Sequence, residues 1–359
     1  MADYSLEERD TLSDDARIKF SIGSERCGEA EGLFSNPRGM AFDHHRGLLF
    51  VVDYDNHRVQ GFSCDDGSLM SKFGTNGNQP GEFKHPWGIA IDHDHDRIFV
   101  SDMFNCRLQV LSLSDPSLSL CIGKKGSGDH EFQYPRGVAI DKHHHRIIIA
   151  DSYNHRLVFL SSIDLSFLFS IGSRGSYPVV FKYPSSIVID HDRHRIIVAD
   201  SNNHRLVFLS LIDGSFLFEF GSQGNQPGQF NNPFGVCIDH QGRIIVADTF
   251  NYRLQAFTHE GHPISSFDCE YAKPFGVAFD EHRGLIAFSA GNQVHVIGAN
   301  QWIPATAFMW RVDRHHRAPR CMKQAVESMT MIRSLHHEST LSLLPNELLF
   351  EIFSFLELS

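Results

Sequence analysis

The chain has 359 residues, of which 42% are hydrophobic, and its formal net charge is −11. This acidic balance disfavours nucleic acid and anionic membranes as partners, unless a local basic patch binds them. Seven scattered cysteines without a Cys-x-x-Cys pair indicate reduced thiols rather than a disulfide framework or a zinc site. The polar N-terminus and the lack of a run of about 20 apolar residues predict a soluble protein of the cytoplasm or nucleus, without membrane contact.

A phrase close to Pro-x-Gly-x-Ala-x-Asp occurs six times. Its copies begin at Pro37, Pro86, Pro135, Pro184, Pro233 and Pro274. Successive starts are 49 residues apart up to Pro233, and the last interval is 41 residues. A period of this length, with short apolar runs between turn residues, predicts the blades of a β-propeller.

One blade can be followed through residues 186–221 as four short runs rich in β-branched and aromatic residues. The runs are 186–190, 195–200, 204–209 and 215–221. Asp, Asn and Gly separate them, so we expect four antiparallel strands in each blade.

The last blade has no fourth strand of its own after 297. A matching run, 17–23, stands before the first blade and resembles 168–172 in sequence. We therefore expect this N-terminal strand to complete the sixth sheet and close the ring, which removes a free sheet edge. The predicted fold is an all-β, six-bladed propeller over residues 17–297.

A second phrase, Val-Asp-x-x-Asn-x-Arg with small variations, follows the first in five blades. Its aspartates are Asp53, Asp102, Asp151, Asp200 and Asp248. The Asp ends the second strand and the Arg, five residues later, opens the third, so a charge-assisted hydrogen bond is expected between them. The Asn suits a left-handed turn position. Because nearly every blade repeats these residues, we interpret them as scaffold.

These copies resemble the NHL repeat, which is named for an Asn-His-Leu signature. The signature appears as Asn56-His57-Arg58-Val59, Asn154-His155-Arg156-Leu157 and Asn203-His204-Arg205-Leu206, with variants at 105–108 and 251–254. The resemblance covers residues 17–297 and implies an NHL-type propeller. The sixth copy, 290–294, lacks both the Asp and the Arg.

Function is expected where the repeat varies. The residue after the repeat Pro is aromatic or Arg in five blades, at the mouth of the channel: Arg38, Trp87, Arg136, Phe234 and Phe275. Neighbouring loops add Tyr54, Phe104, Tyr153 and Phe250. Aromatic rings interleaved with Arg and Lys suit a peptide-binding hot spot or single-stranded RNA. Packing between blades is the structural alternative for each ring.

Some NHL-type propellers are lyases that hold zinc in the central channel through histidines. Here no His follows the repeat Pro, and the nearest candidate, His85, stands alone. A catalytic zinc takes three protein ligands. We therefore expect no catalytic residues, no metal and no cofactor, and a zinc-dependent lyase is the least favoured interpretation.

Histidines gather in the turns between first and second strands, which all open on the other face. They are His44, His45, His93, His95, His143, His144, His145, His191, His194, His240 and His282. We interpret them as solvated turn residues. A ring of imidazoles that binds zinc or nickel adventitiously is the alternative.

After 297 the pattern changes to a linker, 298–320, and a tail expected to be helical, 321–359. Within the tail, 343–358 resembles the start of an F-box, whose first helix docks on the adaptor of a cullin-type ubiquitin ligase. That resemblance implies adaptor contacts at Leu344, Pro345, Leu348, Ile352 and Leu356. The alternative is an amphipathic helix that packs on its own propeller.

The sequence thus predicts a monomeric, non-catalytic protein-interaction module. Its propeller face would bind a protein ligand, and its tail would make it a substrate-recognition subunit of a ubiquitin ligase. The alternative function is RNA binding through the aromatic and basic face.

Overall fold

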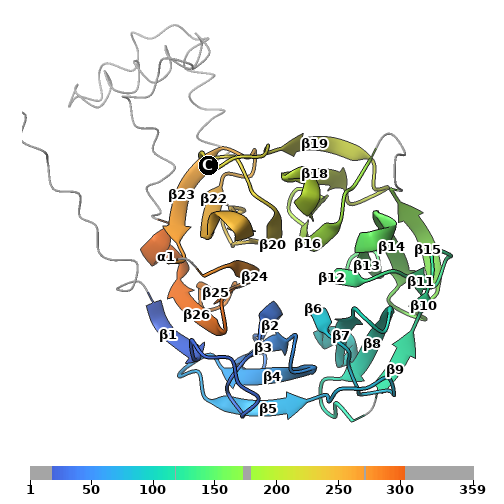
Figure 1. The fold of residues 1–359 in the computed structure, drawn as a ribbon. Helices are drawn as coiled ribbons and strands as arrows, with labels where there is room; N and C mark the ends of the chain where they lie inside the picture. The colour runs from blue at the N-terminus through green and yellow to red at the C-terminus, as the bar shows by residue number, and fades with distance from the viewer. Residues whose placement is uncertain (1–17, 118, 173–178, 271, 304–359) are drawn as a thin grey trace, which may run out of the picture. The chain divides into compact units, whose positions relative to one another are not determined.

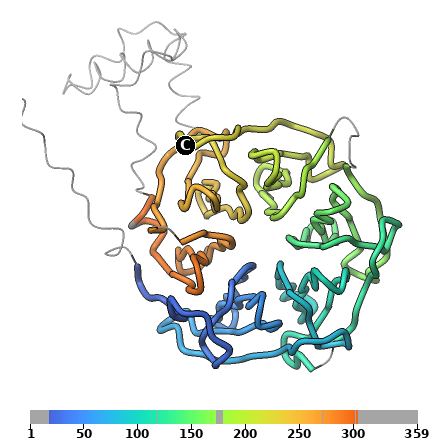
Figure 2. Tube along the Cα trace, viewed as in Figure 1, coloured from blue at the N-terminus to red at the C-terminus, as the bar shows by residue number. Residues whose placement is uncertain are grey.

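Six antiparallel sheets of four strands surround a central channel (Figure 1). The structure, a computed structural model, describes residues 18–117, 119–172, 179–270 and 272–303. The first strand of each sheet lies nearest the centre, and the chain travels outward before it crosses to the next blade (Figure 2). The predicted all-β six-bladed propeller is confirmed.

The strands have nearly equal lengths from blade to blade. The first two blades comprise β2 (Pro37–Asp43), β3 (Leu48–Asp53), β4 (Arg58–Ser63), β5 (Leu69–Phe73), β6 (Pro86–Asp92), β7 (Arg97–Asp102), β8 (Arg107–Ser112) and β9 (Ser119–Ile122). The third and fourth comprise β12 (Pro135–Asp141), β13 (Arg146–Asp151), β14 (Arg156–Ser161), β15 (Phe167–Ile171), β16 (Pro184–Asp190), β17 (Arg195–Asp200), β18 (Arg205–Ser210) and β19 (Phe216–Phe220).

The last two blades differ in how their outer strands arise. The fifth blade comprises β20 (Pro233–Ile238), β21 (Ile244–Asp248), β22 (Arg253–Phe257) and β23 (Pro263–Asp268). The sixth comprises β24 (Pro274–Asp280), β25 (Leu285–Ala290), β26 (Gln293–Gly298) and, from the N-terminus, β1 (Ile18–Gly23). A two-strand ribbon, β10 (Lys124–Lys125) with β11 (Glu131–Phe132), lies in one connector. The N-terminal strand therefore closes the ring, as predicted.

The chain keeps packing on the propeller past residue 297. α1 (Ala299–Trp302) follows β26 directly, although the sequence interpretation had begun a linker at 298. Trp302 and Ile303 are buried in the apolar cluster between the fifth and sixth sheets. No helix in the described part of the chain is long and apolar enough to cross a bilayer. The expected helical tail and its motif at 343–358 lie outside the described residues.

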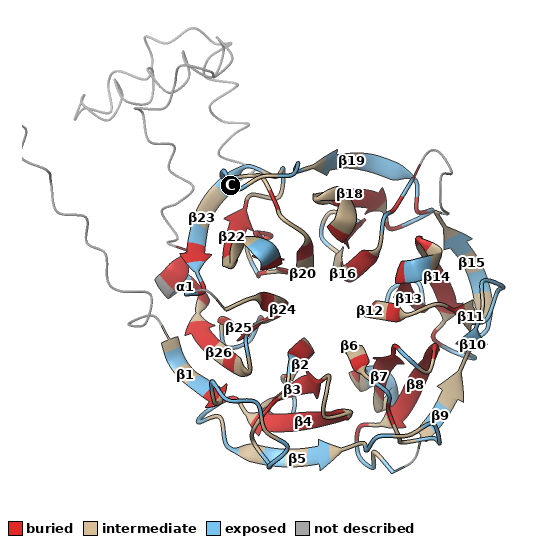
Figure 3. Cartoon of the chain, viewed as in Figure 1, coloured by how far each residue is buried: buried red, intermediate tan, exposed pale blue. Residues whose placement is uncertain are grey.

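The hydrophobic core consists of layers between adjacent sheets. Middle strands such as β13 and β17 are buried along their whole length. Outer strands such as β5 and β15 instead alternate between partly buried and exposed residues (Figure 3). A cluster that includes Ile148, Phe159, Ile196 and Leu209 joins the third sheet to the fourth. Each blade thus buries its faces against its neighbours, as expected of a repeat protein.

The glycine of the Pro-x-Gly phrase lets the first strands approach one another around the channel. An ideal Cβ on Gly39 would lie 2.6 Å from the carbonyl oxygen of Trp87, and one on Gly235 would lie 2.6 Å from that of Phe275. No side chain fits at such distances without a backbone shift. The channel is therefore narrow, and the residue before each glycine is held close to its counterparts in other blades.

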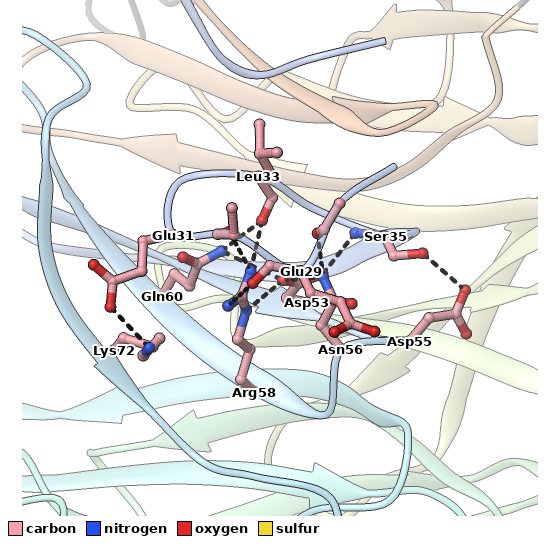
Figure 4. Close-up of polar contacts among 12 residues, drawn as sticks. Glu29, Glu31, Leu33, Ser35, Asp53, Asp55, Asn56, Arg58, Gln60 and Lys72 are labelled. Carbon is pink, nitrogen blue, oxygen red and sulfur yellow. Dashed lines mark hydrogen bonds and ion pairs between the residues drawn. The ribbon is translucent and has the colours of Figure 1, made fainter. Parts of the chain in front are cut away.

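The recurrent Asp and Arg form a buried network, shown for the first blade in Figure 4. Asp53 Oδ2 accepts hydrogen bonds from Arg58 Nε at 2.7 Å and Asn56 Nδ2 at 2.9 Å, and Asp53 Oδ1 accepts one from the Ser35 N–H at 2.8 Å. Arg58 also donates to the carbonyl oxygens of residues 29, 30 and 33. The network ties the hairpin to the preceding connector, which confirms the scaffold interpretation.

One detail of that interpretation was wrong. The left-handed turn position is not the Asn but the residue after it, with φ of 55° at His57 and 57° at His155. The Asn has a different role. Its side-chain amide nitrogen donates hydrogen bonds to the Asp carboxylate and to a carbonyl oxygen of the connector, as Asn56 does with Asp53 and Gly28.

Candidate ligand-binding face of the propeller

Five of the predicted site residues come together at one end of the channel. Each is the second residue of a first strand: Arg38 on β2, Trp87 on β6, Arg136 on β12, Phe234 on β20 and Phe275 on β24. The fourth blade contributes Ser185, whose hydroxyl donates to the carbonyl oxygen of Phe234 at 2.7 Å. We call this set, Ser185 included, the channel mouth.

Arg38 lies among aromatic rings. Its guanidinium carbon is 3.5 Å from the ring centre of Phe275. It is also 4.9 Å from the ring of Trp87 and 5.0 Å from that of Tyr54. Such contacts attract a cation to the negative face of the ring.

The side chains also meet across the channel. Trp87 and Phe234 come from opposite blades, yet their ring centres are 5.8 Å apart. Arg136 lies over both, at 4.6 Å from Trp87 and 5.4 Å from Phe234. The rings thus narrow this end of the channel and present two guanidinium groups between them.

Neither of these arginines has a carboxylate partner within the described residues. Nε and Nη1 of Arg38 and Nε of Arg136 are buried without a hydrogen-bond acceptor there. Burial lowers the pKa of Arg38 to about 10 although Tyr54 and Asp55 oppose the shift, and burial likewise lowers the pKa of Arg136 to about 10. A buried cation without a partner is energetically costly, so this site favours an incoming anion.

A row of rings extends from the channel mouth over the same face. Tyr54 contacts His85 at 4.6 Å between ring centres, and His85 contacts Phe104 at 4.9 Å. The row continues through Tyr134, Tyr153 and Tyr183, with centre distances from 4.5 to 5.2 Å. Phe104 and Tyr153 are exposed. We call the row from Tyr54 to Tyr183 the aromatic arc.

His85, Tyr134 and Tyr183 were not among the predicted site residues. Each stands immediately before a repeat Pro, with φ between 51° and 57°. The peptide N–H of His85 donates to His57 Nδ1 at 3.0 Å, and that of Tyr183 donates to His155 Nδ1 at 3.2 Å. The signature His therefore fixes this left-handed position in the next blade. The sequence signal that could have identified these residues is the recurrence of an aromatic or imidazole side chain immediately before the repeat Pro.

The remaining predicted residue, Phe250, lies apart from the arc. Its ring centre is 6.5 Å from that of Phe234, and Lys273 Nζ lies 4.7 Å above the ring. Lys84 and Lys182 are exposed beside His85 and Tyr183. All nine predicted propeller residues therefore lie on one face, at the channel mouth, in the arc or beside them, together with basic side chains.

The cavity under the channel mouth is small. It measures about 100 Å³ and is lined by residues of all six first strands, including Arg38, Trp87 and Phe275. Small-molecule sites usually measure about 300–1,000 Å³. A carboxylate or another compact polar group fits this volume better than a whole metabolite does.

Sequence comparison places the NHL repeat at residues 34–62, 132–158, 181–207 and 230–257, in four of the six blades. The chain is an NHL-repeat propeller. In this NHL propeller the second and sixth blades keep the same four-stranded architecture although the repeat is not matched there. No curated protein sequence matches the chain.

Solved structures share the fold at low sequence identity. A streptogramin B lyase is 11% identical with a TM-score of 0.53, over 73% of this chain and 93% of the lyase chain. A protein of unknown function from Bacteroides thetaiotaomicron is 18% identical with a TM-score of 0.57, over 77% of this chain and 73% of its own. A chain of a nidogen/laminin complex is 17% identical with a TM-score of 0.53, over 65% and 80%. At these identities the likeness concerns the propeller fold alone.

Proposed function

We propose that the propeller is a non-catalytic protein-interaction module, and that its ligand inserts an acidic group into the channel mouth. The ligand backbone and side chains would then cover the exposed rings of the aromatic arc. Aromatic residues and Arg are the residue types that contribute most to binding at protein interfaces. The nidogen/laminin relative is a fold precedent for a propeller in a protein complex.

The observation that carries this proposal is the pair of unpartnered guanidiniums at Arg38 and Arg136. A carboxylate accepts two parallel N–H bonds from a guanidinium, and such charge-assisted bonds are the strong ones. The surrounding rings exclude water, which strengthens the attraction. A ligand carboxylate would satisfy the free nitrogen atoms and remove much of the cost of burying two cations.

Selection of peptides displayed against the propeller tests the proposal. We expect the enriched peptides to carry Asp, Glu or a free C-terminal carboxylate. Arg38→Met should weaken their binding about 10- to 100-fold, because a hydrogen bond to a charged group contributes about 1.5–3 kcal/mol. The matched control is Arg46→Met, since Arg46 pairs with Asp43 at the other end of the channel. Binding that is equal in the two variants contradicts the proposal.

RNA is the alternative ligand, because phosphates also bind arginine and bases stack on rings. The rings of the aromatic arc contact one another edge to face, with interplanar angles of 61–73° from Phe104 to Tyr183, so neighbouring edges cover part of their faces. This packing and the net charge of −11 favour a protein ligand. Salt-dependent RNA affinity that is lost in Arg136→Ala would favour the alternative.

The C-terminal residues support a second part of the proposal. The run Leu344-Pro345-Asn346-Glu347-Leu348 and the later Ile352 and Leu356 resemble the adaptor-binding start of an F-box. We infer that the chain links its propeller ligand to a cullin-type ubiquitin ligase through this segment.

Pull-down of the ligase adaptor tests that link. The double variant Leu348→Ala/Ile352→Ala removes two large apolar contacts and should reduce recovery at least about 10-fold, since each buried side chain contributes about 1.5–3 kcal/mol. Leu343→Ala, just before the proposed contact residues, is the control. Equal recovery of the wild type and the double variant removes the ligase link and leaves the propeller proposal standing.

A further inference from the structure

Four histidines gather at the end of the channel opposite the channel mouth. His44 and His45 follow β2, His93 follows β6 and His282 follows β24, so the group draws on three adjacent blades. β2, β6 and β24 are each seven residues long, which separates the two ends of the channel by roughly 20 Å at about 3.3 Å per residue. This group is therefore independent of the proposed ligand-binding face.

The imidazoles are in mutual contact. His44 and His45 have ring centres 4.2 Å apart, and each lies within 4.5 Å of the His93 ring. One ligand atom from each of these three lies within 4.8 Å of the other two. Tetrahedral zinc holds nitrogen ligands about 3.3 Å apart at bond lengths of about 2.0–2.1 Å. Modest side-chain rotation thus brings the three nitrogens into coordination.

His93 is the anchor of the group. Its side chain is only 6% exposed, and within the described residues its Nδ1 has no hydrogen-bond partner. Asp43 Oδ1 lies 3.6 Å from that atom and is itself buried. A carboxylate behind a metal-binding imidazole fixes its tautomer and orientation, which is the usual surrounding of a histidine ligand.

The other residues around the three imidazoles leave one side of the group open to a cavity. His282 stacks on His44 at 4.3 Å with an interplanar angle of 6°. A cavity of about 290 Å³ adjoins the rings and is lined by His44, His93 and His282 together with Lys142 and Glu281.

We propose that His44, His45 and His93 form a binding site for a borderline divalent transition metal such as Zn²⁺, with its fourth position open to the adjoining cavity. Three imidazole ligands and an open position suit zinc. The sequence had favoured solvated turn residues here. The structure adds that these three residues, which are up to 49 positions apart in the chain, converge on one point, and that the side chain of His93 is only 6% exposed.

Titration of the metal-free full chain with Zn²⁺ against a chromophoric chelator tests the site. We expect one Zn²⁺ per chain, and a loss of affinity of about 10-fold or more in His45→Ala, because even the replacement of a residue that only hydrogen-bonds to a metal ligand typically costs 10–100-fold. His45 is exposed, so its replacement leaves the fold intact. The control is His95→Ala: His95 is also exposed and lies in the 3-10 turn that begins at His93, but its Nδ1 faces Asp92 at 2.9 Å.

Cobalt gives an independent readout. Co²⁺ bound in place of Zn²⁺ should show the visible absorption of a tetrahedral ion in the wild type and in His95→Ala, and not in His45→Ala. Weak binding at several sites that is unchanged in His45→Ala, or equal losses in the two variants, would overturn the proposal. Neither result bears on the ligand-binding face.

Discussion

A chain that begins after Ile22 should melt roughly 10 °C or more below the full protein. β1 pairs with β26 from Ile18↔Ile297 to Gly23↔Gln293, and Ile22 is 5% exposed within the cluster that joins the sixth sheet to the first. Loss of a buried Ile side chain alone costs about 2–5 kcal/mol. In a domain of this size, 4–5 kcal/mol corresponds to a fall of roughly 10 °C.

The deletion also exposes a new sheet edge. Without β1 the backbone of β26 loses its outer partner, and an unpaired edge promotes association between molecules. We therefore expect concentration-dependent aggregation of the truncated chain as well as a lower Tm. A chain that starts at 17 retains β1 and is the control. Ile22→Ala should reproduce part of the loss, while Lys19→Ala, at an exposed position of the same strand, should not. An unchanged Tm after the deletion would show that ring closure does not depend on β1.

The architecture was predictable because the repeat imposes it. The constant interval between Pro37 and Pro233 gave the blades, and the missing fourth strand after 297 pointed to 17–23 at the other end of the chain. Both inferences need only sequence order and strand pairing. α1 was not predicted, because a single turn that ends in Trp302 has no periodic pattern, and its position depends on the apolar cluster between the last two blades.

The candidate sites were predictable only in part. The alignment of the repeat copies predicted that Arg38 and Trp87 lie on one face, because it shows which residue begins each first strand. It did not show that Trp87 would meet Phe234 across the channel, because that contact depends on how closely glycine lets the strands approach. His44 and His93 likewise meet only because their turns come from adjacent blades.

The protein contains two kinds of buried arginine, and this difference separates scaffold from site. Arg107 donates from Nε to Asp102 at 2.8 Å and from its remaining nitrogens to the carbonyl oxygens of Asn78, Gln79 and Glu82. Arg38 has rings around it and no carboxylate among the described residues. The guanidinium of Arg107 is hydrogen-bonded within the fold, whereas that of Arg38 is available to a ligand.

Arg107→Met should therefore lower the free energy of unfolding by about 3–5 kcal/mol, because breaking a buried ion pair leaves the partner charge uncompensated. Its removal also takes away a group that lowers the pKa of Asp102, whose pKa burial already raises. The folded-state pKa of Asp102 then rises further. The loss of unfolding free energy relative to the wild type is therefore largest above the raised pKa of Asp102, and it becomes smaller as the pH falls through that pKa. Chemical denaturation of both proteins at pH 7 and at pH 5 measures this difference in the free energy of unfolding.

Arg38→Met should leave the free energy of unfolding unchanged or raise it. The pKa of Arg38 is lowered in the folded state, so its charge costs the folded protein free energy at every pH below about 10, and a Met of similar length does not carry that cost. Lost contacts with the rings of Phe275 and Trp87 offset part of the gain. A loss comparable to that of Arg107→Met would place Arg38 in the scaffold and remove the basis for an acidic ligand. The two substitutions are thus expected to change the free energy of unfolding differently. This difference indicates that the channel mouth favours ligand binding at a cost in stability.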